Sequence, residues 1–329
     1  MSRLIVVMYH YVRDLERSRF PAIKGLTVEK FRGQIDYLGR HARFVRVEDV
    51  LAALRGETRD FPPLAALLTF DDGYSDHFRY VFPILDERGI QGCFFPPLRS
   101  VRDRAVLDVN KIHFALAACD GAGTLAAYCL QRIDWLREEY GLDSGEHYLA
   151  TYAHASRFDD AETIFVKRLL QRGLPEAARA RIADELFRRF VTTDEAAFAE
   201  ELYLSPDQVK TMRRAGMYFG AHGVSHRWLD SLDREEQRDE LRGSREMLAE
   251  LGYGRNEWIV GYPFGGFNDT TLEVAREEGF SAGFTIEARI AAIGREDALR
   301  IPRLDTADLP HAADGPPPTL APIAWPDQP

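Results

Sequence analysis

Two adjacent carboxylates follow one of the most apolar runs of this sequence. The run from Leu64 to Phe70 ends in Asp71, Asp72 and Gly73. An uninterrupted apolar run is typical of a strand that is covered on both faces. Charged groups are costly inside such a strand, so the two acids mark its end, where side chains open into a cleft. Taken alone, the same pattern also fits an ordinary turn with solvated acids.

A pair of histidines four residues apart, His222 and His226, follows a second apolar run. One carboxylate and two imidazoles with an open coordination position form a common catalytic site for Zn²⁺ or a similar divalent ion. The spacing puts both imidazoles on one face if the segment is helical. Such a pair often arises by chance, but together with Asp71 and Asp72 at an equivalent strand end it favours a metal site.

The second carboxylate is then available as a general base. A metal lowers the pKa of its water, and a carboxylate within hydrogen-bonding reach takes the proton. The hydroxide attacks a carbonyl, and the metal and a backbone N–H stabilise the resulting oxyanion. Phe264, which follows Pro263 in the segment Tyr262–Gly265, could supply that N–H. The same segment also fits a plain turn.

Strand-like and helix-like segments alternate on both sides of these motifs, which predicts a mostly parallel sheet or barrel. Strands are expected at 4–7, 44–47, 64–70, 91–95, 217–221, 258–261, 281–286 and 299–301, and helices at 27–38, 50–54, 75–88, 206–215, 234–251 and 270–278. Right-handed crossovers place the carboxyl ends of parallel strands on one side. We therefore expect His10, the two acids, the two histidines and the Tyr262–Gly265 segment to meet there.

Residues 103–204 lack this alternation and have Ala, Arg, Glu and Leu at helical spacing. They predict an insertion of three to five helices without strands. Because the flanking strands both end on the active face, we expect the insertion to overhang it. Its polar residues Asn110, Lys111 and His113 are then candidates for selecting the substrate. The Pro-rich segment 309–329 is expected to be extended or partly disordered.

Composition excludes several classes of function. The 329 residues carry a formal net charge of −10, which argues against binding nucleic acid or an anionic membrane. No apolar run approaches the roughly 18 residues that span a bilayer. The N-terminal apolar run is short and fits a first strand better than a signal peptide. Three cysteines without a C-x-x-C motif fit a reducing cytoplasm, where we expect the protein to act.

Four motifs together resemble the polysaccharide deacetylase (NodB-homology) family, carbohydrate esterase family four. They are Tyr9-His10-Tyr11, Thr69-Phe-Asp-Asp-Gly73, His222-x-x-x-His226 and Tyr262-Pro-Phe-Gly265. The resemblance covers residues 1–102 and 205–308, and leaves the insertion 103–204 and the segment 309–329 unmatched. It implies an α/β fold, a distorted and incomplete (β/α) barrel, and hydrolysis of N- or O-acyl groups on sugars. It also implies that Asp71 is the base and that Asp72, His222 and His226 bind the metal.

Two features depart from the pattern of that family. Many members have an arginine before the proline of the third motif that steadies the base, whereas this chain has Val260-Gly261-Tyr262 there. Arg303, at a late strand end, is expected to take this role by bidentate pairing, although it also fits a surface charge. The closing Leu-x-His motif, which supplies the acid, is not evident. His10 is the better candidate for the acid, and His311 in the Pro-rich segment is the alternative.

Four further residues are expected to contact the substrate: Tyr9, Tyr262, Pro263 and His113. The predicted function is a cytoplasmic, Zn²⁺-dependent deacetylase of an acylamino sugar or glycan. Its substrate is expected to be a nucleotide- or lipid-linked intermediate of surface-polysaccharide (O-antigen- or capsule-like) assembly. Two alternatives remain, a deformylase of a carrier-linked amino sugar and a catalytically inactive glycan-binding relative. No oligomeric state is predicted.

Overall fold

The computed structural model describes residues 2–58 and 60–316. The chain forms two compact units. The first comprises residues 1–14, 25–103 and 200–329, and the second comprises residues 15–24 and 104–199. The second unit thus includes a segment, Leu15–Lys24, that the sequence analysis placed in the catalytic part.

The first unit is built on a mostly parallel set of strands that supports the predicted barrel. Its strands are β1 (Arg3–Tyr9), β2 (Val12–Arg13), β3 (Leu26–Thr27), β4 (Arg43–Phe44), β5 (Leu64–Asp71), β6 (Gly92–Phe95), β7 (Tyr218–Phe219), β8 (Ile259–Gly261), β9 (Ala282–Phe284), β10 (Ala291–Ala292) and β11 (Leu304–Asp305). The main sheet runs β10-β1-β5-β6-β7, with β4 on β5 and β11 on β1. Within it, β10 is antiparallel to β1, and the other pairs are parallel.

The pairing continues beyond β7 through single bridges. Ala221, just after β7, bridges Val260 of β8, and β8 pairs with β9. Phe284 of β9 bridges Ile301, and β11 a few residues later pairs with β1. These pairings are consistent with a distorted α/β barrel, the predicted fold class.

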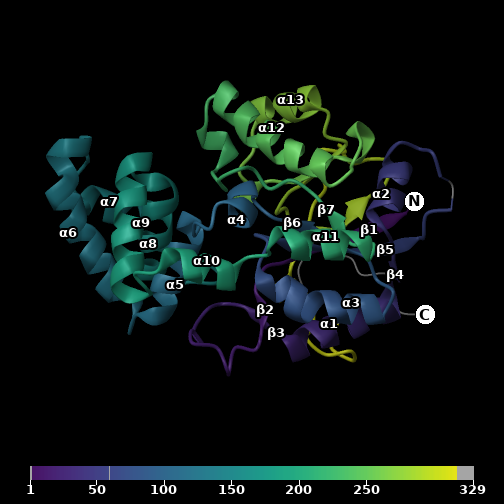
Figure 1. Cartoon of the computed structure of the whole chain (residues 1–329), viewed down its shortest axis with the longest axis horizontal. Coiled ribbons are helices and arrows are strands. Elements are labelled where there is room, and N and C mark those ends of the chain that lie inside the picture. Colours follow the sequence, from purple (N-terminus) through teal and green to yellow (C-terminus); the bar gives the residue numbers. More distant parts are fainter. Residues whose placement is uncertain (1, 59, 317–329) are drawn as a thin grey trace. The chain divides into compact units, whose positions relative to one another are not determined.

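Helices of the first unit connect these strands. They are α1 (Val28–His41), α2 (Val47–Leu54), α3 (Phe82–Glu87), α4 (Leu98–Arg102), α11 (Pro206–Arg214), α12 (Arg234–Glu250) and α13 (Asp269–Glu278). In Figure 1, α12 and α13 lie next to each other, and Arg234, Arg238 and Arg242 of α12 form ion pairs with glutamates of α13. The helix α1 begins as predicted, because the Thr27 side chain accepts a hydrogen bond from the Lys30 backbone N–H.

Several predicted element bounds were wrong. The strand expected at 44–47 ends at Phe44, because Val47 already begins α2. The strand expected at 217–221 is reduced to two residues of β7. The helix expected from Ser75 does begin there, but it passes through a π-helical turn, His77–Val81, before α3. Such single π-turns are frequently found at functional sites, and this one follows the two acids directly.

The second unit is helical and has its own apolar core. Its helices are α5 (Asp108–Ala118), α6 (Ala122–Tyr140), α7 (Gly145–Tyr152), α8 (Ala161–Arg168), a π-helical turn (Leu169–Gly173), α9 (Glu176–Phe190) and α10 (Glu195–Leu202), which ends in the first unit. This is more than the three to five helices predicted. The segment 104–199, all of it described, contains no strand, as expected. In the described part of the chain, no helix is both long and apolar enough to cross a bilayer.

The start of the Pro-rich segment is packed, contrary to expectation. Leu309 is buried, and the His311 carbonyl lies against Gly33 of α1, where a Cβ would collide with it. Arg40 donates a hydrogen bond to the Ala313 carbonyl oxygen at 3.0 Å. The small Gly33 explains this close approach of two backbones. The rest of the predicted extended segment, 317–329, lies outside the described residues.

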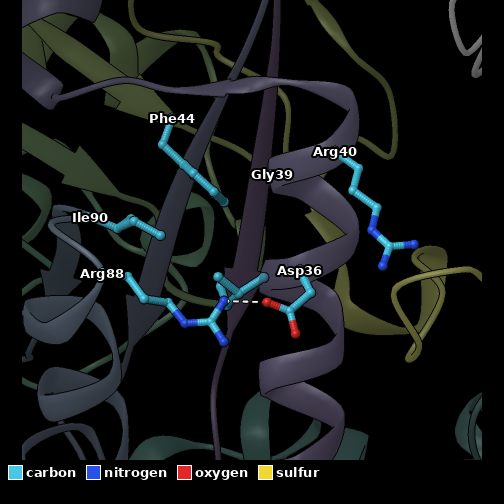
Figure 2. Close-up of a pocket in the computed structure, with 7 residues that line it drawn as sticks. Asp36, Gly39, Arg40, Phe44, Arg88 and Ile90 are labelled. Atoms are coloured by element: carbon cyan, nitrogen blue, oxygen red, sulfur yellow. Dashed lines mark hydrogen bonds and ion pairs between the residues drawn. The ribbon is translucent and has the colours of Figure 1, made fainter.

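A pocket of about 440 Å³ lies next to α1 and is shown in Figure 2. Its walls include Ile35, Phe44 and Ile90, and an ion pair between Asp36 and Arg88 lines it. None of the predicted site residues lines this pocket. Most of its walls come from α1, with Phe44 from β4 and with Arg88 and Ile90 from the segment between α3 and β6.

Candidate active site

The two acids lie at the carboxyl end of β5, where the backbone turns sharply. Asp71 is the last residue of β5, and Asp72 has a φ of 70°. Left-handed backbone at a residue other than glycine costs of order 1–3 kcal/mol and is concentrated at functional sites. Gly73 also has a positive φ, and a Cβ there would lie 2.6 Å from Pro96 Cβ. The turn therefore requires glycine, and it presents both carboxylates at the strand end.

The histidine pair lies in a loop and not on a helix, so the expected helical spacing does not apply. His226 has a φ of 60°. The Nδ1 of His222 lies 2.7 Å from the Gly261 carbonyl oxygen. Because a carbonyl only accepts, Nδ1 carries the proton and Nε2 keeps its lone pair, the tautomer that a metal ligand needs.

Three side chains converge in a buried cluster, Asp72, His222 and His226. Their potential ligand atoms all lie within 4.8 Å of one another. Asp72 Oδ1 is 3.1 Å from His226 Nε2 and 3.6 Å from His222 Nε2. This oxygen is buried without a hydrogen-bond donor among the described residues, whereas Oδ2 accepts from the Tyr74 hydroxyl at 2.5 Å. A buried oxygen without a donor, facing two imidazole nitrogens, fits a divalent cation.

The charges of these groups also fit a metal site. Burial raises the pKa of Asp72, but His226 and His222 outweigh it and hold that pKa well below its usual value. Burial lowers the pKa of His226, although the Asp72 charge opposes this. A carboxylate and a neutral imidazole are the forms that bind divalent metals.

Asp71 faces a different partner, the fully buried Arg303. Arg303 Nη1 lies 2.8 Å from Asp71 Oδ1, and Arg303 Nε donates to the Thr285 carbonyl oxygen at 2.9 Å. The contact to Asp71 is a single hydrogen bond and not the bidentate pair expected, and Arg303 Nη2 is buried without a hydrogen-bond partner among the described residues. Burial raises the pKa of Asp71, but Arg303, His222 and His10 lower it more, so the net pKa lies below its usual value. Asp71 is thus ionised near neutral pH, as a general base must be.

Arg303→Met should destabilise the protein by about 3–5 kcal/mol, because the buried Asp71 carboxylate is left without its cation. The measurement is urea unfolding at several pH values. The pKa of Asp71 is lower in the folded protein than its unfolded value of about 3.9. The ion pair with Arg303 therefore stabilises the folded state fully above about pH 3.9, and this stabilisation is lost as the pH falls through the folded pKa. The difference from wild type should therefore be largest near neutral pH and shrink in acid.

Arg300→Met is the matched control for this variant, because Arg300 is exposed and pairs with the exposed Glu287. Its effect should stay within about 1 kcal/mol, the range of surface ion pairs. Equal destabilisation by the two substitutions at neutral pH would contradict the assigned Arg303–Asp71 pairing.

Phe264 lies beside the metal cluster. Its ring centroid is 4.5 Å from that of His226, and it stacks on Trp228 at 4.8 Å. Its φ of 57° departs from ordinary helix geometry within the short turn Pro263–Gly265. The role of its N–H as an oxyanion donor stays a prediction.

Three residues expected to contact substrate are buried. Tyr262 has no exposed surface, and its hydroxyl donates to the Leu299 carbonyl oxygen at 2.9 Å. Tyr9 is likewise fully buried and packs on Phe31 and Phe70. Pro263 is buried as well. Their side chains therefore support the site from inside the protein, and direct contact of the two tyrosines with a substrate is not compatible with their burial.

The two candidate proton donors, His10 and His311, and the predicted substrate-contacting residue His113 have distinct surroundings. His10 has a side chain that is 41% exposed, and its Nε2 lies 4.0 Å from Asp71 Oδ2. His113 belongs to α5 of the helical unit, and His311 belongs to the packed segment against α1. These positions place His10 beside the acids within the first unit, as the sequence analysis expected. The part that His113 plays stays a prediction.

Sequence reasoning missed His77, which supports His10. The His77 Nε2 lies 2.9 Å from the His10 carbonyl oxygen, so Nε2 carries the proton and donates it. Burial lowers the pKa of His77 to about 4, which keeps the ring neutral. His77 begins the π-helical turn that follows the two acids, and its contact to the His10 carbonyl joins segments 67 positions apart in the sequence.

Comparisons with known proteins agree with this site. Residues 184–283 match the model of the polysaccharide deacetylase family. The match contains both histidines and the Tyr262–Gly265 segment, but not the two acids or Arg303. YxkH of Bacillus subtilis (strain 168), named as a polysaccharide deacetylase, is 28% identical over 90 residues. These are 27% of this chain and 32% of YxkH, so the chain matches about a third of this curated relative.

Solved structures share the fold over nearly the whole chain. The deacetylase PplD of Streptococcus pyogenes, solved in complex with acetate, has a TM-score of 0.56 at 18% identity, with 92% of each chain covered. IcaB from Ammonifex degensii has a TM-score of 0.54 at 20% identity, over 92% of this chain and 91% of that one. A de-N-acetylase from Aggregatibacter actinomycetemcomitans has a TM-score of 0.52 at 16% identity, over 93% and 96%.

Fold and site thus define a class, the deacetylase-type α/β barrels with an Asp-His-His cluster at the strand ends. Within this class, the family model, the curated relative and the solved structures all indicate the polysaccharide deacetylase (NodB-homology) family. The family predicted from the four motifs is therefore confirmed.

Proposed function

We propose that this protein is a metal-dependent hydrolase that removes the N-acetyl group of an amino sugar in a glycan or glycan precursor. The observation that carries the proposal is the buried Asp72–His222–His226 cluster beside an ionised Asp71. The deacetylase fold of the chain supports it. A nucleotide- or lipid-linked intermediate of surface-polysaccharide assembly is the proposed form of the substrate.

Asp72, His222 and His226 would hold the metal, with Zn²⁺ as the proposed ion. A divalent cation bound there supplies a Lewis acid that polarises the acyl carbonyl and lowers the pKa of a water molecule. Asp71 accepts the proton of the attacking water, and Arg303 keeps this carboxylate ionised and oriented. The Phe264 N–H is the proposed donor to the oxygen that becomes negative during attack.

The leaving amine needs a proton, because an amide anion is too basic to depart unaided. His10 is the proposed donor, since it is partly exposed and close to Asp71. The hydrogen bond from His77 to the His10 carbonyl oxygen holds this part of the backbone in place. A histidine suits this role because its ordinary pKa lies near neutrality.

His10→Ala should keep the metal and lower kcat by about a hundredfold or more, the usual contribution of general acid catalysis. A chain that ends before His311 serves as the comparison and should keep metal and most of its activity. If instead the truncated chain loses turnover and His10→Ala retains it, His311 is the acid and His10 is not.

The substrate class is tested by measuring acetate release from N-acetylated amino sugars, free, nucleotide-linked and lipid-linked. Matched O-acetylated and N-formylated sugars show whether the site prefers another acyl group. Absence of release from every N-acetylated sugar by metal-loaded protein would contradict the proposal.

In the same assay, His113→Ala should raise KM with little change in kcat if the helical insertion selects the substrate.

A further inference from the structure

Glu240 of α12 contacts the loop between the two metal-site histidines through both carboxylate oxygens. Its Oε2 accepts hydrogen bonds from the backbone N–H groups of Val224 at 2.8 Å and Ser225 at 2.9 Å. Its Oε1 accepts from the Ser225 hydroxyl. Glu240 is only 6% exposed. A buried carboxylate with three donors from one loop is a strong, charge-assisted anchor.

The loop has a conformation that it would not hold by itself. Gly223 and His226 both have positive φ, 71° and 60°. For a residue other than glycine such backbone costs of order 1–3 kcal/mol and persists where surrounding structure imposes it. A Cβ at position 223 would lie 2.8 Å from Glu240 Oε2, so the carboxylate sits directly against this backbone.

The opposite side of the loop is held by α4. The backbone N–H groups of Leu98 and Arg99, at the start of α4, donate to the carbonyl oxygens of Gly223 and Val224 at 3.1 and 3.0 Å. The carbonyl oxygens of Gly223 and Val224 are thus satisfied by α4, and the N–H groups of Val224 and Ser225 by Glu240. Removing Glu240 would leave two partly buried N–H groups without their acceptor.

Glu240 has no competing electrostatic role in the described part of the chain. No lysine or arginine among those residues forms an ion pair with it, whereas Glu236 on the same helix pairs with Arg227. Glu240 is therefore a buried acid that has no cation as a partner and bonds to a single loop. This indicates that its role is to hold that loop in place.

We propose that Glu240 is a positioning residue that holds the 222–226 loop in its metal-binding conformation. The inference rests on the proposed metal site, and it adds a residue outside the four motifs to that site. Glu240 acts through His222 and His226 and does not touch the substrate.

The test is metal affinity, measured with Zn²⁺ against a chromogenic chelator and with Co²⁺ by its visible absorption spectrum. Glu240→Ala should weaken Zn²⁺ binding by about 10–100-fold, the usual effect of losing an outer contact of a metal site. Glu240→Gln should lose less Zn²⁺ affinity than Glu240→Ala, because its amide oxygen still accepts hydrogen bonds from the N–H groups. Saturating Zn²⁺ should restore the kcat of Glu240→Gln. Glu246→Ala is the matched control, since Glu246 is an exposed residue of the same helix, and it should bind as wild type.

Ser225→Ala removes only the hydrogen bond from the Ser225 hydroxyl to Glu240. It can therefore replace Glu240→Ala in this test if Glu240→Ala does not fold. It should weaken Zn²⁺ binding in the same direction by a smaller factor. Wild-type affinity and an unchanged Co²⁺ spectrum in the folded Glu240 and Ser225 variants would overturn the inference while leaving the proposed function intact. A wild-type protein that binds neither ion would overturn both.

Discussion

Replacing Asp71 by asparagine should leave the metal in place and lower kcat by about a hundredfold to ten-thousandfold, the contribution of a general base. The side chain keeps its shape but no longer takes a proton. Its carboxylate points toward Arg303 and His10 and lies outside the cluster of metal ligands. The measurement is kcat for acetate release together with metal content per chain.

The mirror substitution, Asp72→Asn, is the matched comparison. Asp72 supplies an oxygen to the cluster, so this variant should bind metal more weakly. Because Asp71→Asn leaves the buried Arg303 without a counter-charge, urea unfolding must show that the assayed protein is folded. If the phenotypes are exchanged, with metal lost from Asp71→Asn and kept by Asp72→Asn, the roles of the adjacent acids are reversed.

His222→Ala should weaken metal binding by more than about a hundredfold, beyond the effect of losing an outer contact, and activity should be lost with it. The Nδ1 proton of His222 is bonded to Gly261, so Nε2 is the atom available to the metal. Excess metal should raise the unfolding temperature of the wild type but not of the variant, because only bound metal stabilises the folded state.

His147→Ala is the control, since His147 is an exposed histidine of the helical unit. It should keep both its metal and the metal-dependent rise in unfolding temperature. Full metal content in His222→Ala, measured on folded protein, would rule out His222 as a ligand.

Much of this protein follows from the sequence because its central signals are local. The uninterrupted apolar run before Asp71 predicts a covered strand, and β5 ends at that residue. Alternating strands and helices predict a parallel arrangement, which the pairings of β1, β5, β6 and β7 bear out. The helix capped by Thr27 and the all-helical segment after β6 are also local patterns.

Other features depend on contacts between distant segments, which no local pattern encodes. The histidine spacing would place both imidazoles on one face of a helix, but hydrogen bonds from α4 and to Glu240 hold the segment as a loop with positive φ. Tyr9 and Tyr262 have residue types common in binding sites, yet packing in the tertiary structure buries both.

The sequence by itself determined the fold class, the family and the candidate residues, because apolar periodicity and short motifs are properties of neighbouring residues. Only the tertiary structure decided how these residues pair. It brings Arg303 to Asp71 across 232 positions of sequence, through a single hydrogen bond and not a bidentate one. It also leaves Asp72 facing the two histidines. The two adjacent acids differ because each side chain meets a different distant partner in a buried site, where nearby charges set which groups are ionised.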